Sequence, residues 1–316
     1  MELRKDYVLD RWVIIATGRK KRKMEFKEEK KEADETNCFF CPGNESSTPP
    51  EKGRIEDNGK WIIRWFDNKF AAAEMKGDYK VKTANTFFTF SDSWGDHEII
   101  VETDNHRKQL WDFEPDHIRK ILTVYSQRVL ELEKLEGISY VQVFKNHGLE
   151  AGTSLVHSHT QVVALSQIPA LVKRKTANIK KFGENCPYCS VIEIEKSSDR
   201  RCFENNTFAA FCPYASQYNY EIAIFPKRHA RRLDKLTDDE FTDLADILKK
   251  VLSKLKELNP SYNLYLHYSP AEENLHMHFE ICPRIALFGG FELSSDMTIN
   301  IISPEEAAKF YRGEEQ

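Results

Sequence analysis

The chain has 316 residues, with 46 Lys or Arg against 50 Asp or Glu, so its formal net charge is −4. Its length predicts two domains at roughly 100–200 residues each, and a hydrophobic content of 41% is typical of a globular protein. The near-neutral charge argues against a nucleic-acid partner, which would require a basic excess. No apolar run is long enough for a membrane span, and the first residues lack the core of a signal peptide. We therefore expect a cytoplasmic protein with no membrane partner.

Four of the seven cysteines form two Cys-x-x-Cys pairs. Each pair is followed, in the same order, by a single histidine and then by a His-x-His triplet. In a chain with no secretion signal, such pairs indicate metal or redox chemistry before structural disulfides. Zinc prefers thiolate and imidazole ligands in a tetrahedral array, so each copy can supply a Cys2His2 set. The candidate ligands are Cys38, Cys41 and His106 with one histidine of the triplet at 157–159, and Cys186, Cys189 and His229 with His276 or His278.

The segments between these residues repeat in chain order. Residues 68–72 are echoed by 206–210, and the apolar stretch 97–101 by 220–224. An acidic helix start follows at 114–116 and again at 237–240, and apolar residues then recur at helical spacing. β-Rich segments at 139–144 and 262–266 lead to the two triplets. We predict a tandemly duplicated α+β protein with mainly antiparallel sheets and packed helices. The predicted domains are 1–170 and 171–316, with a polar boundary near 173–185.

The first triplet offers a candidate nucleophile. In a strand, alternate side chains share one face, so His157, His159 and Gln161 would line a single surface. If one triplet histidine binds the metal, the other is spare, and a neutral imidazole can attack a phosphoryl centre. The basic cluster 19–22 and the segment 152–154 could supply the charge and donors that phosphoryl transfer needs. The simpler alternative is that the second histidine is only packed in the core.

The segment from Asn146 to Gln161 resembles the signature of the galactose-1-phosphate uridylyltransferase family, a branch of the histidine-triad superfamily. The likeness extends over nearly the whole chain and includes residues 10–22, 97–106 and 290–312. The resemblance implies two tandem histidine-triad-like domains, the first of them catalytic, and a ping-pong reaction through a covalent nucleotidyl-histidine. It also implies a homodimer that acts on a nucleotide sugar and a sugar phosphate.

Carried over to this sequence, the resemblance makes His159 the nucleophile and Gln161 a hydrogen-bond donor to the transferred phosphoryl group. His157 becomes the fourth zinc ligand of the first site. The second set, completed by His276, is similar to the two-zinc pattern of ADP-glucose phosphorylase relatives, so two Zn²⁺ per chain are expected. The implied substrate contacts are Arg19, Arg22, Asn68, Asn146, Gly152, Ser154 and Glu292.

The sequence departs from the family pattern at positions that bear on substrate choice. Ser158 replaces the usual proline between the two histidines, Lys69 stands where an aspartate is usual, and residues 285–289 lack a lysine. The main hypothesis is conversion of UDP-glucose and galactose 1-phosphate to glucose 1-phosphate and UDP-galactose. The alternative is an adenylyltransferase or phosphorylase that uses ADP-glucose or a related dinucleotide. A third possibility is a zinc-stabilised nucleotide-binding module without catalysis.

The remaining cysteines and histidines have simpler interpretations. The three cysteines outside the pairs are expected to be buried apolar residues. We expect His278, the counterpart of His159, either to be a non-catalytic remnant of the duplication or to line the substrate pocket. No functional role is assigned to His97, His117, His147 or His267.

Overall fold

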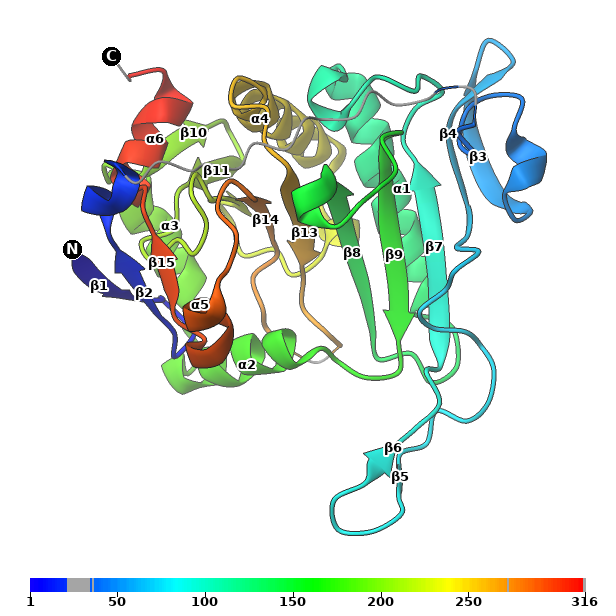
Figure 1. Cartoon of the computed structure of the whole chain (residues 1–316), viewed down its shortest axis with the longest axis horizontal. Helices are drawn as coiled ribbons and strands as arrows, with labels where there is room; N and C mark the ends of the chain where they lie inside the picture. The colour runs from blue at the N-terminus through cyan, green and yellow to red at the C-terminus, as the bar shows by residue number, and fades with distance from the viewer. Residues whose placement is uncertain (22–34, 36, 272, 315–316) are drawn as a thin grey trace.

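The structure is a computed structural model that describes residues 1–21, 35, 37–271 and 273–314. Its centre is a ten-stranded antiparallel sheet with the order β10-β11-β12-β14-β13-β8-β9-β7-β4-β3 (Figure 1). The strands of this sheet are β3 (Glu51–Asp57), β4 (Lys60–Asp67), β7 (Gly95–Val101), β8 (Tyr140–His147), β9 (His159–Leu165), β10 (Arg201–Glu204), β11 (Phe208–Phe211), β12 (Ile222–Pro226), β13 (Tyr262–His267) and β14 (His278–Pro283).

The two halves of the sheet have the same strand order. Outward from the centre, one half runs β8, β9, β7, β4 and β3, and the other runs β13, β14, β12, β11 and β10. The halves join where β8 and β13 pair antiparallel, with Tyr262 opposite His147 and Tyr265 opposite Phe144. The prediction of a duplicated α+β fold with antiparallel sheets is confirmed. The duplication forms one continuous sheet rather than two separate ones.

Each half carries one long helix at the equivalent place, α1 (Pro115–Leu132) and α4 (Asp238–Lys256), and the two helices pack against each other. Both predicted helix starts are confirmed. Pro115 begins α1, where the missing amide proton costs nothing because that group has no partner inside the helix. Thr237 caps α4 in a capping box with Glu240, in which each side chain accepts a hydrogen bond from the backbone of the other residue. The apolar faces of both helices are buried in the main core.

The N-terminal segment packs against the C-terminal half. In a three-stranded sheet, β1 (Glu2–Lys5) pairs antiparallel with β2 (Trp12–Ile15), which pairs parallel with β15 (Thr298–Asn300). Arg4 forms an ion pair of 2.9 Å with Glu305 of helix α6 (Pro304–Arg312). The other helices are α2 (Ala170–Ile179), α3 (Pro187–Glu195) and α5 (Gly290–Ser295). The stretch that we expected to separate the domains forms most of α2, and its Lys175 is buried. The boundary at 170/171 itself stays a prediction.

A hairpin of β5 (Lys82–Thr83) and β6 (Thr89–Phe90) projects from the body of the molecule (Figure 1). Phe87, Phe88 and Phe90 are exposed on it. The three cysteines outside the pairs are buried as predicted; they are Cys202, Cys212 and Cys282. Within the described ranges, no helix is both long enough and apolar enough to cross a bilayer.

Candidate functional site

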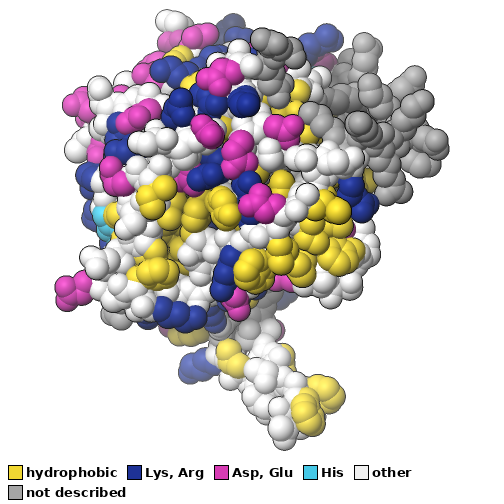
Figure 2. Space-filling model, turned by 90° about the vertical axis from the view of Figure 1, so that its left-hand side faces the viewer, with side chains coloured by type: hydrophobic (Ala, Val, Ile, Leu, Met, Phe, Trp, Pro, Cys, Tyr) yellow, Lys and Arg dark blue, Asp and Glu magenta, His cyan; other side chains and the backbone are white. Residues whose placement is uncertain are grey.

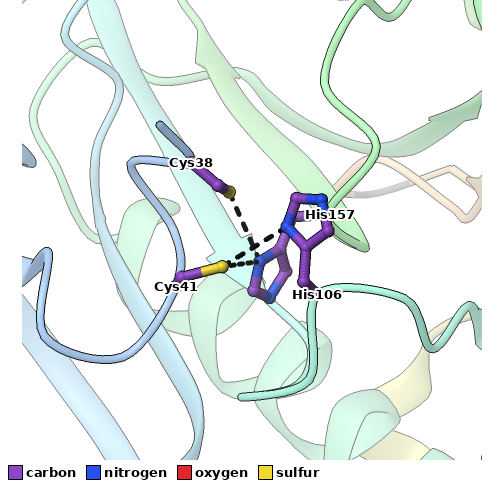
Figure 3. Close-up of side chains that lie close together, drawn as sticks. All are labelled: Cys38, Cys41, His106 and His157. Atoms are coloured by element: carbon purple, nitrogen blue, oxygen red, sulfur yellow. Dashed lines mark hydrogen bonds between the residues drawn. The ribbon is translucent and has the colours of Figure 1, made fainter. Parts of the chain in front are cut away.

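The first Cys-x-x-Cys pair meets two histidines from distant parts of the chain (Figure 3). The Sγ atoms of Cys38 and Cys41 each lie 3.6 Å from Nδ1 of His157, and Cys41 Sγ lies 3.3 Å from Nδ1 of His106. All four candidate ligand atoms lie within 4.8 Å of one another. A tetrahedral zinc with ordinary bond lengths would separate its sulfur and nitrogen ligands by about 3.5 Å. The donor set therefore fits one metal ion of this kind.

The protonation of His157 also suits a metal ligand. Its Nε2 lies 2.7 Å from the carbonyl oxygen of Thr103, and a carbonyl can only accept, so Nε2 carries the proton. The lone pair is then on Nδ1, which faces the two cysteines. Burial lowers the pKa of His157 to about 4, so the ring is neutral at pH 7. Such a hydrogen bond on the far nitrogen is the usual way in which proteins orient a histidine ligand.

The second cluster repeats this arrangement. Nδ1 of His276 lies 3.8 Å from Cys186 Sγ and 3.5 Å from Cys189 Sγ, and Nδ1 of His229 lies 3.6 Å from Cys189 Sγ. The far nitrogen of each ring is again held, by the carbonyl oxygen of Pro226 at 2.9 Å for His276 and by Asn274 Oδ1 at 2.8 Å for His229. Both predicted Cys2His2 sets are thus assembled, and each could hold a metal ion.

His159 begins β9, directly after the first cluster. Its Nδ1 lies 2.8 Å from the carbonyl oxygen of His157, so Nδ1 carries the proton and Nε2 carries the lone pair. Burial, with the nearby Lys145 ammonium, lowers the pKa of His159 to about 4 and keeps the imidazole neutral. Among the described residues, Nε2 has no hydrogen-bond partner. Phe40 packs edge-on against this ring, with 5.3 Å between the ring centroids.

Gln161 lies two residues further along β9 and so faces the same side as His159. Its Oε1 is 3.0 Å from Nε2 of His97, a buried residue of β7. Asn68, at the end of β4, has its Nδ2 3.1 Å from the same nitrogen. Asn68 and Gln161 therefore both lie beside His97, a residue for which the sequence predicted no role. Only the register of β7 against β9, with Ile99 opposite Gln161, shows that His97 belongs to this face.

The C-terminal half of the sheet contributes to the loop that precedes the triplet. Nδ2 of Asn263, on β13, donates to Asn146 Oδ1 and to the carbonyl oxygen of Ala151, both at 2.9 Å. Gly148 has φ 82°, and a Cβ there would lie 2.2 Å from Ser261 Oγ, so only glycine fits. A Cβ on Gly152 would lie 3.8 Å from Nδ2 of Asn146, which places Asn146 and Gly152 side by side.

A buried polar network lies on the opposite face of β9. The carboxylate of Glu102 accepts hydrogen bonds from Lys145 Nζ at 2.7 Å and from the hydroxyls of Ser158 and Thr160, both at 2.6 Å. Lys145 Nζ also donates to the carbonyl oxygen of His159 at 2.9 Å. Burial alone would raise the pKa of Glu102, but Lys145 and the hydroxyls outweigh it and lower the pKa to about 2. Ser158, the replacement for the usual proline, is thus part of this network.

His278, the counterpart of His159, is held differently. Its Nδ1 lies 2.8 Å from the carbonyl oxygen of His276, which repeats the first copy. Its Nε2, however, lies 3.0 Å from Nζ of Lys175 and 3.1 Å from Oε1 of Glu280. The lone pair that would attack a substrate is therefore occupied by the buried Lys175 ammonium.

For three of the predicted substrate contacts, the structure shows no contact with His159. Arg19 is exposed in the short helix Thr17–Lys21 after β2, and Glu292 lies in α5, where its carboxylate accepts from the backbone of Gly289 at 2.9 Å. Figure 1 shows β2 and α5 against the C-terminal half, away from β9. Ser154 is exposed in the segment before the triplet. Arg22 lies outside the described residues.

This duplicated α+β fold, with two Cys2His2 clusters and His-x-His triplets, is shared with a family of nucleotidyltransferases. Residues 1–169 match the family described as galactose-1-phosphate uridyl transferase, N-terminal domain, and residues 113–310 match a domain of unknown function, DUF4921. The chain belongs to the galactose-1-phosphate uridylyltransferase family.

Known proteins are similar to the chain over nearly its whole length. ADP-glucose phosphorylase of Arabidopsis thaliana is 34% identical, with 98% of this chain and 92% of that protein covered. Galactose-1-phosphate uridylyltransferase of Thermotoga maritima is 27% identical, with 99% and 98% covered. A crystal structure of an Arabidopsis thaliana ADP-glucose phosphorylase with bound ADP-glucose superimposes with a TM-score of 0.84 at 33% identity, covering 98% of this chain and 97% of that one.

The ion pair between Glu102 and Lys145 makes a testable contribution to stability. We expect Lys145→Met to lower the free energy of unfolding at pH 7 by about 3–5 kcal/mol, because it leaves a buried carboxylate without its cation. Because folding lowers the pKa of Glu102 from 4.5 to about 2, its contribution is present above pH 4.5 and is lost as the pH falls toward 2. Urea unfolding at pH 7 measures the first effect, and urea unfolding from pH 4.5 down to pH 2 measures the second.

The double variant Lys145→Met/Glu102→Gln is the matched control, since it removes both charges. It should recover most of the lost stability at pH 7. If Lys145→Met alone unfolds at the same urea concentration as the wild type, the ion pair does not have this role.

Proposed function

We propose that the chain takes the adenylyl group from ADP-glucose, or a related dinucleotide, onto His159 and then transfers it to phosphate. The orientation of His159 carries this proposal: its Nδ1 is held by a backbone carbonyl, its ring is neutral, and its Nε2 lone pair is available. A non-catalytic binding module would not need this arrangement. The second copy, in which Lys175 occupies the same nitrogen, shows that the fold does not require it.

The proposed reaction has two displacements at one phosphorus atom. In the first, Nε2 of His159 attacks the α-phosphorus, a P–N bond forms, and the P–O bond to glucose 1-phosphate breaks, so that glucose 1-phosphate leaves with the electron pair. The proton on Nδ1 stays in its hydrogen bond to the carbonyl of His157 throughout. In the second, a phosphate oxygen attacks, the P–N bond breaks, and ADP and neutral His159 are released. The NH2 group of Gln161 is proposed to donate to the phosphoryl oxygens as charge develops on them.

The choice of ADP-glucose over UDP-glucose rests on similarity and on the metal ligands. The Arabidopsis thaliana ADP-glucose phosphorylase matches at higher identity than the Thermotoga maritima uridylyltransferase. The second Cys-x-x-Cys set and Lys69 also favour an adenylyltransferase or phosphorylase over the uridylyltransferase that was the main hypothesis from the sequence. Galactose 1-phosphate as the acceptor is therefore the less supported of the two assignments.

The donor is tested by intact mass after separate incubation with ADP-glucose and UDP-glucose and an alkaline quench that preserves phosphohistidine. We expect the mass of one AMP residue to be added to the wild type. His159→Ala should abolish the adduct because it removes the attacking nitrogen, and inorganic phosphate should discharge the wild-type adduct as ADP.

His278→Ala, the equivalent change in the second copy, is the matched control and should keep the adduct. A UMP adduct that galactose 1-phosphate discharges would restore the uridylyltransferase hypothesis. If neither donor labels the chain, covalent catalysis on these substrates is wrong.

We further propose that both clusters bind zinc, because two thiolates and two imidazoles are ligands that zinc prefers. In the first set, Cys38, Cys41, His106 and His157 would hold an ion that fixes the chain just before the nucleophile. The second set has no free nucleophile beside it, so its role would be structural.

Metal analysis of the purified chain should return two zinc ions, and Cys41→Ser and Cys189→Ser should each return one. Because structural zinc stabilises the folded state, we expect a chelator to lower the melting temperature of all three proteins. One zinc in the wild type would remove the second site from the proposal. Cys202→Ser, outside both clusters, should keep both ions.

We also propose a homodimer that pairs through the outer face of the three-stranded sheet. On the inner face, Val13 and Ile15 are buried. On the outer face, Leu3, Ile14 and Ile299 form one row across the strands, beside Trp12, which is 40% exposed. The solvent face of such a sheet is normally polar. Figure 2 shows hydrophobic side chains gathered on this side of the molecule.

Ile14→Glu would place a charge in the middle of this row. We expect light scattering to give twice the chain mass for the wild type and the single chain mass for Ile14→Glu. Ile194→Glu, at a position of α3 that is 65% exposed, is the control and should stay dimeric. A monomeric wild type, or a dimer that Ile14→Glu leaves intact, would contradict the proposed interface.

A further inference from the structure

His97 is a buried histidine with hydrogen bonds at both ring nitrogens. It is 7% exposed and lies on β7, on the same face of the sheet as His159 and Gln161. Its Nδ1 is 3.1 Å from the backbone nitrogen of Ala72, and its Nε2 is 3.0 Å from Oε1 of Gln161. It is not one of the candidate metal ligands, and the proposed chemistry does not use it directly.

These contacts determine where the proton on His97 lies. A backbone N–H can only donate, so Nδ1 accepts from Ala72 and has no proton. Burial lowers the pKa of His97 and keeps the ring neutral, so its single proton is on Nε2. Nε2 therefore donates to Gln161, which must present its oxygen, and the Gln161 NH2 group is turned away from His97.

The same proton affects Asn68. Nδ2 of Asn68 lies 3.1 Å from His97 Nε2, but a protonated nitrogen cannot accept a hydrogen bond from it. The oxygen of the Asn68 amide already accepts from the backbone of Phe70 at 2.9 Å. In this assignment Asn68 makes no hydrogen bond to His97, and the Gln161 oxygen is the partner of Nε2.

The second copy has Glu221 at the register position of His97, and the histidine nearest to its counterpart of Gln161 is His267 of β13, with 3.6 Å between His267 Nε2 and Glu280 Oε2. Glu280 occupies the position of Gln161, two residues after the second histidine of the triplet, and its Oε1 contacts His278 Nε2 at 3.1 Å and Lys175 Nζ at 2.6 Å. A side chain at this position can thus turn toward the triplet histidine, where Glu280 accepts from the same Lys175 ammonium that donates to the free nitrogen of His278. In the first copy, the bond from His97 holds the Gln161 oxygen away from His159.

We propose that His97 is a positioning residue, whose Nε2–H fixes the Gln161 amide so that its NH2 group faces the phosphoryl oxygens beside His159. This inference rests on the proposed function, because it assigns His97 a role in the same transfer. His97 acts only through Gln161 and makes no contact with the reacting atoms.

Two substitutions distinguish the hydrogen bond that His97 accepts from Ala72 from the one that it donates to Gln161. His97→Asn can keep an acceptor for the Ala72 N–H but loses the donor to Gln161. His97→Gln can place an NH2 group near the former Nε2 and so keeps that donor. We expect His97→Asn to slow adenylyl-enzyme formation from ADP-glucose in a single turnover by about 10²-fold, the usual effect of a misplaced catalytic group. KM should change little, and His97→Gln should recover most of the rate.

Adding His97→Asn to a Gln161→Ala variant tests whether the two residues act together. There His97→Asn should cause no further loss of rate, because the group it orients is already absent. Equal losses in the Asn and Gln variants, or additive losses with Gln161→Ala, would show that His97 only supports the fold and would overturn the proposal. A wild type that forms no adduct would instead overturn the proposed function, and the inference with it.

One readout does not depend on activity. In ¹⁵N NMR of the histidine rings at pH 7, His97 should be neutral with its proton on Nε2. A proton on Nδ1, or a doubly protonated ring, would contradict the assignment even in an active enzyme. Thermal melting of each variant checks that the chain still folds.

Discussion

The hydrogen bond from Nδ1 of His159 to the carbonyl oxygen of His157 determines which nitrogen of the candidate nucleophile is free. This bond depends on the first Cys2His2 cluster, because His157 supplies both the carbonyl and the ring that faces the cysteines. The His157 ring is held in turn by the carbonyl of Thr103. A metal ion in this cluster would therefore restrain the nucleophile through one backbone carbonyl, without contacting the substrate.

The two copies share this arrangement and differ in what meets Nε2 of the second triplet histidine. His278 is oriented by His276 in the same way, yet its Nε2 meets a buried lysine. That lysine comes from α2, in the segment between the two copies. The metal cluster and the triplet alone therefore do not define a catalytic histidine. What distinguishes His159 is that Nε2 lacks a partner among the described residues while Gln161 beside it is held by His97.

Local sequence patterns were enough to predict the repeated elements and the metal ligands. Helical spacing predicted α1 and α4, because it is a pattern within one short segment. The ordered Cys-His pattern predicted both clusters, because it occurs twice in the same order. The pairing of β8 with β13, the union of β2 with β15, and the roles of His97 and Lys145 could not be predicted in this way. They depend on the register between strands far apart in the chain, and a shift of one residue would turn His97 to the other face.

The continuous sheet explains why a copy without a free nucleophile still matters to the first site. Asn263 of β13 holds both Asn146 and the carbonyl of Ala151, and Ser261 approaches the chain so closely at Gly148 that no other residue fits there. The loop that leads to His157 is therefore shaped by the second half of the molecule. Because these contacts cross the seam between β8 and β13, the first half alone would keep its ligands and triplet but lose the restraint on Asn146. The duplicated half thus acts as a scaffold for the first triplet.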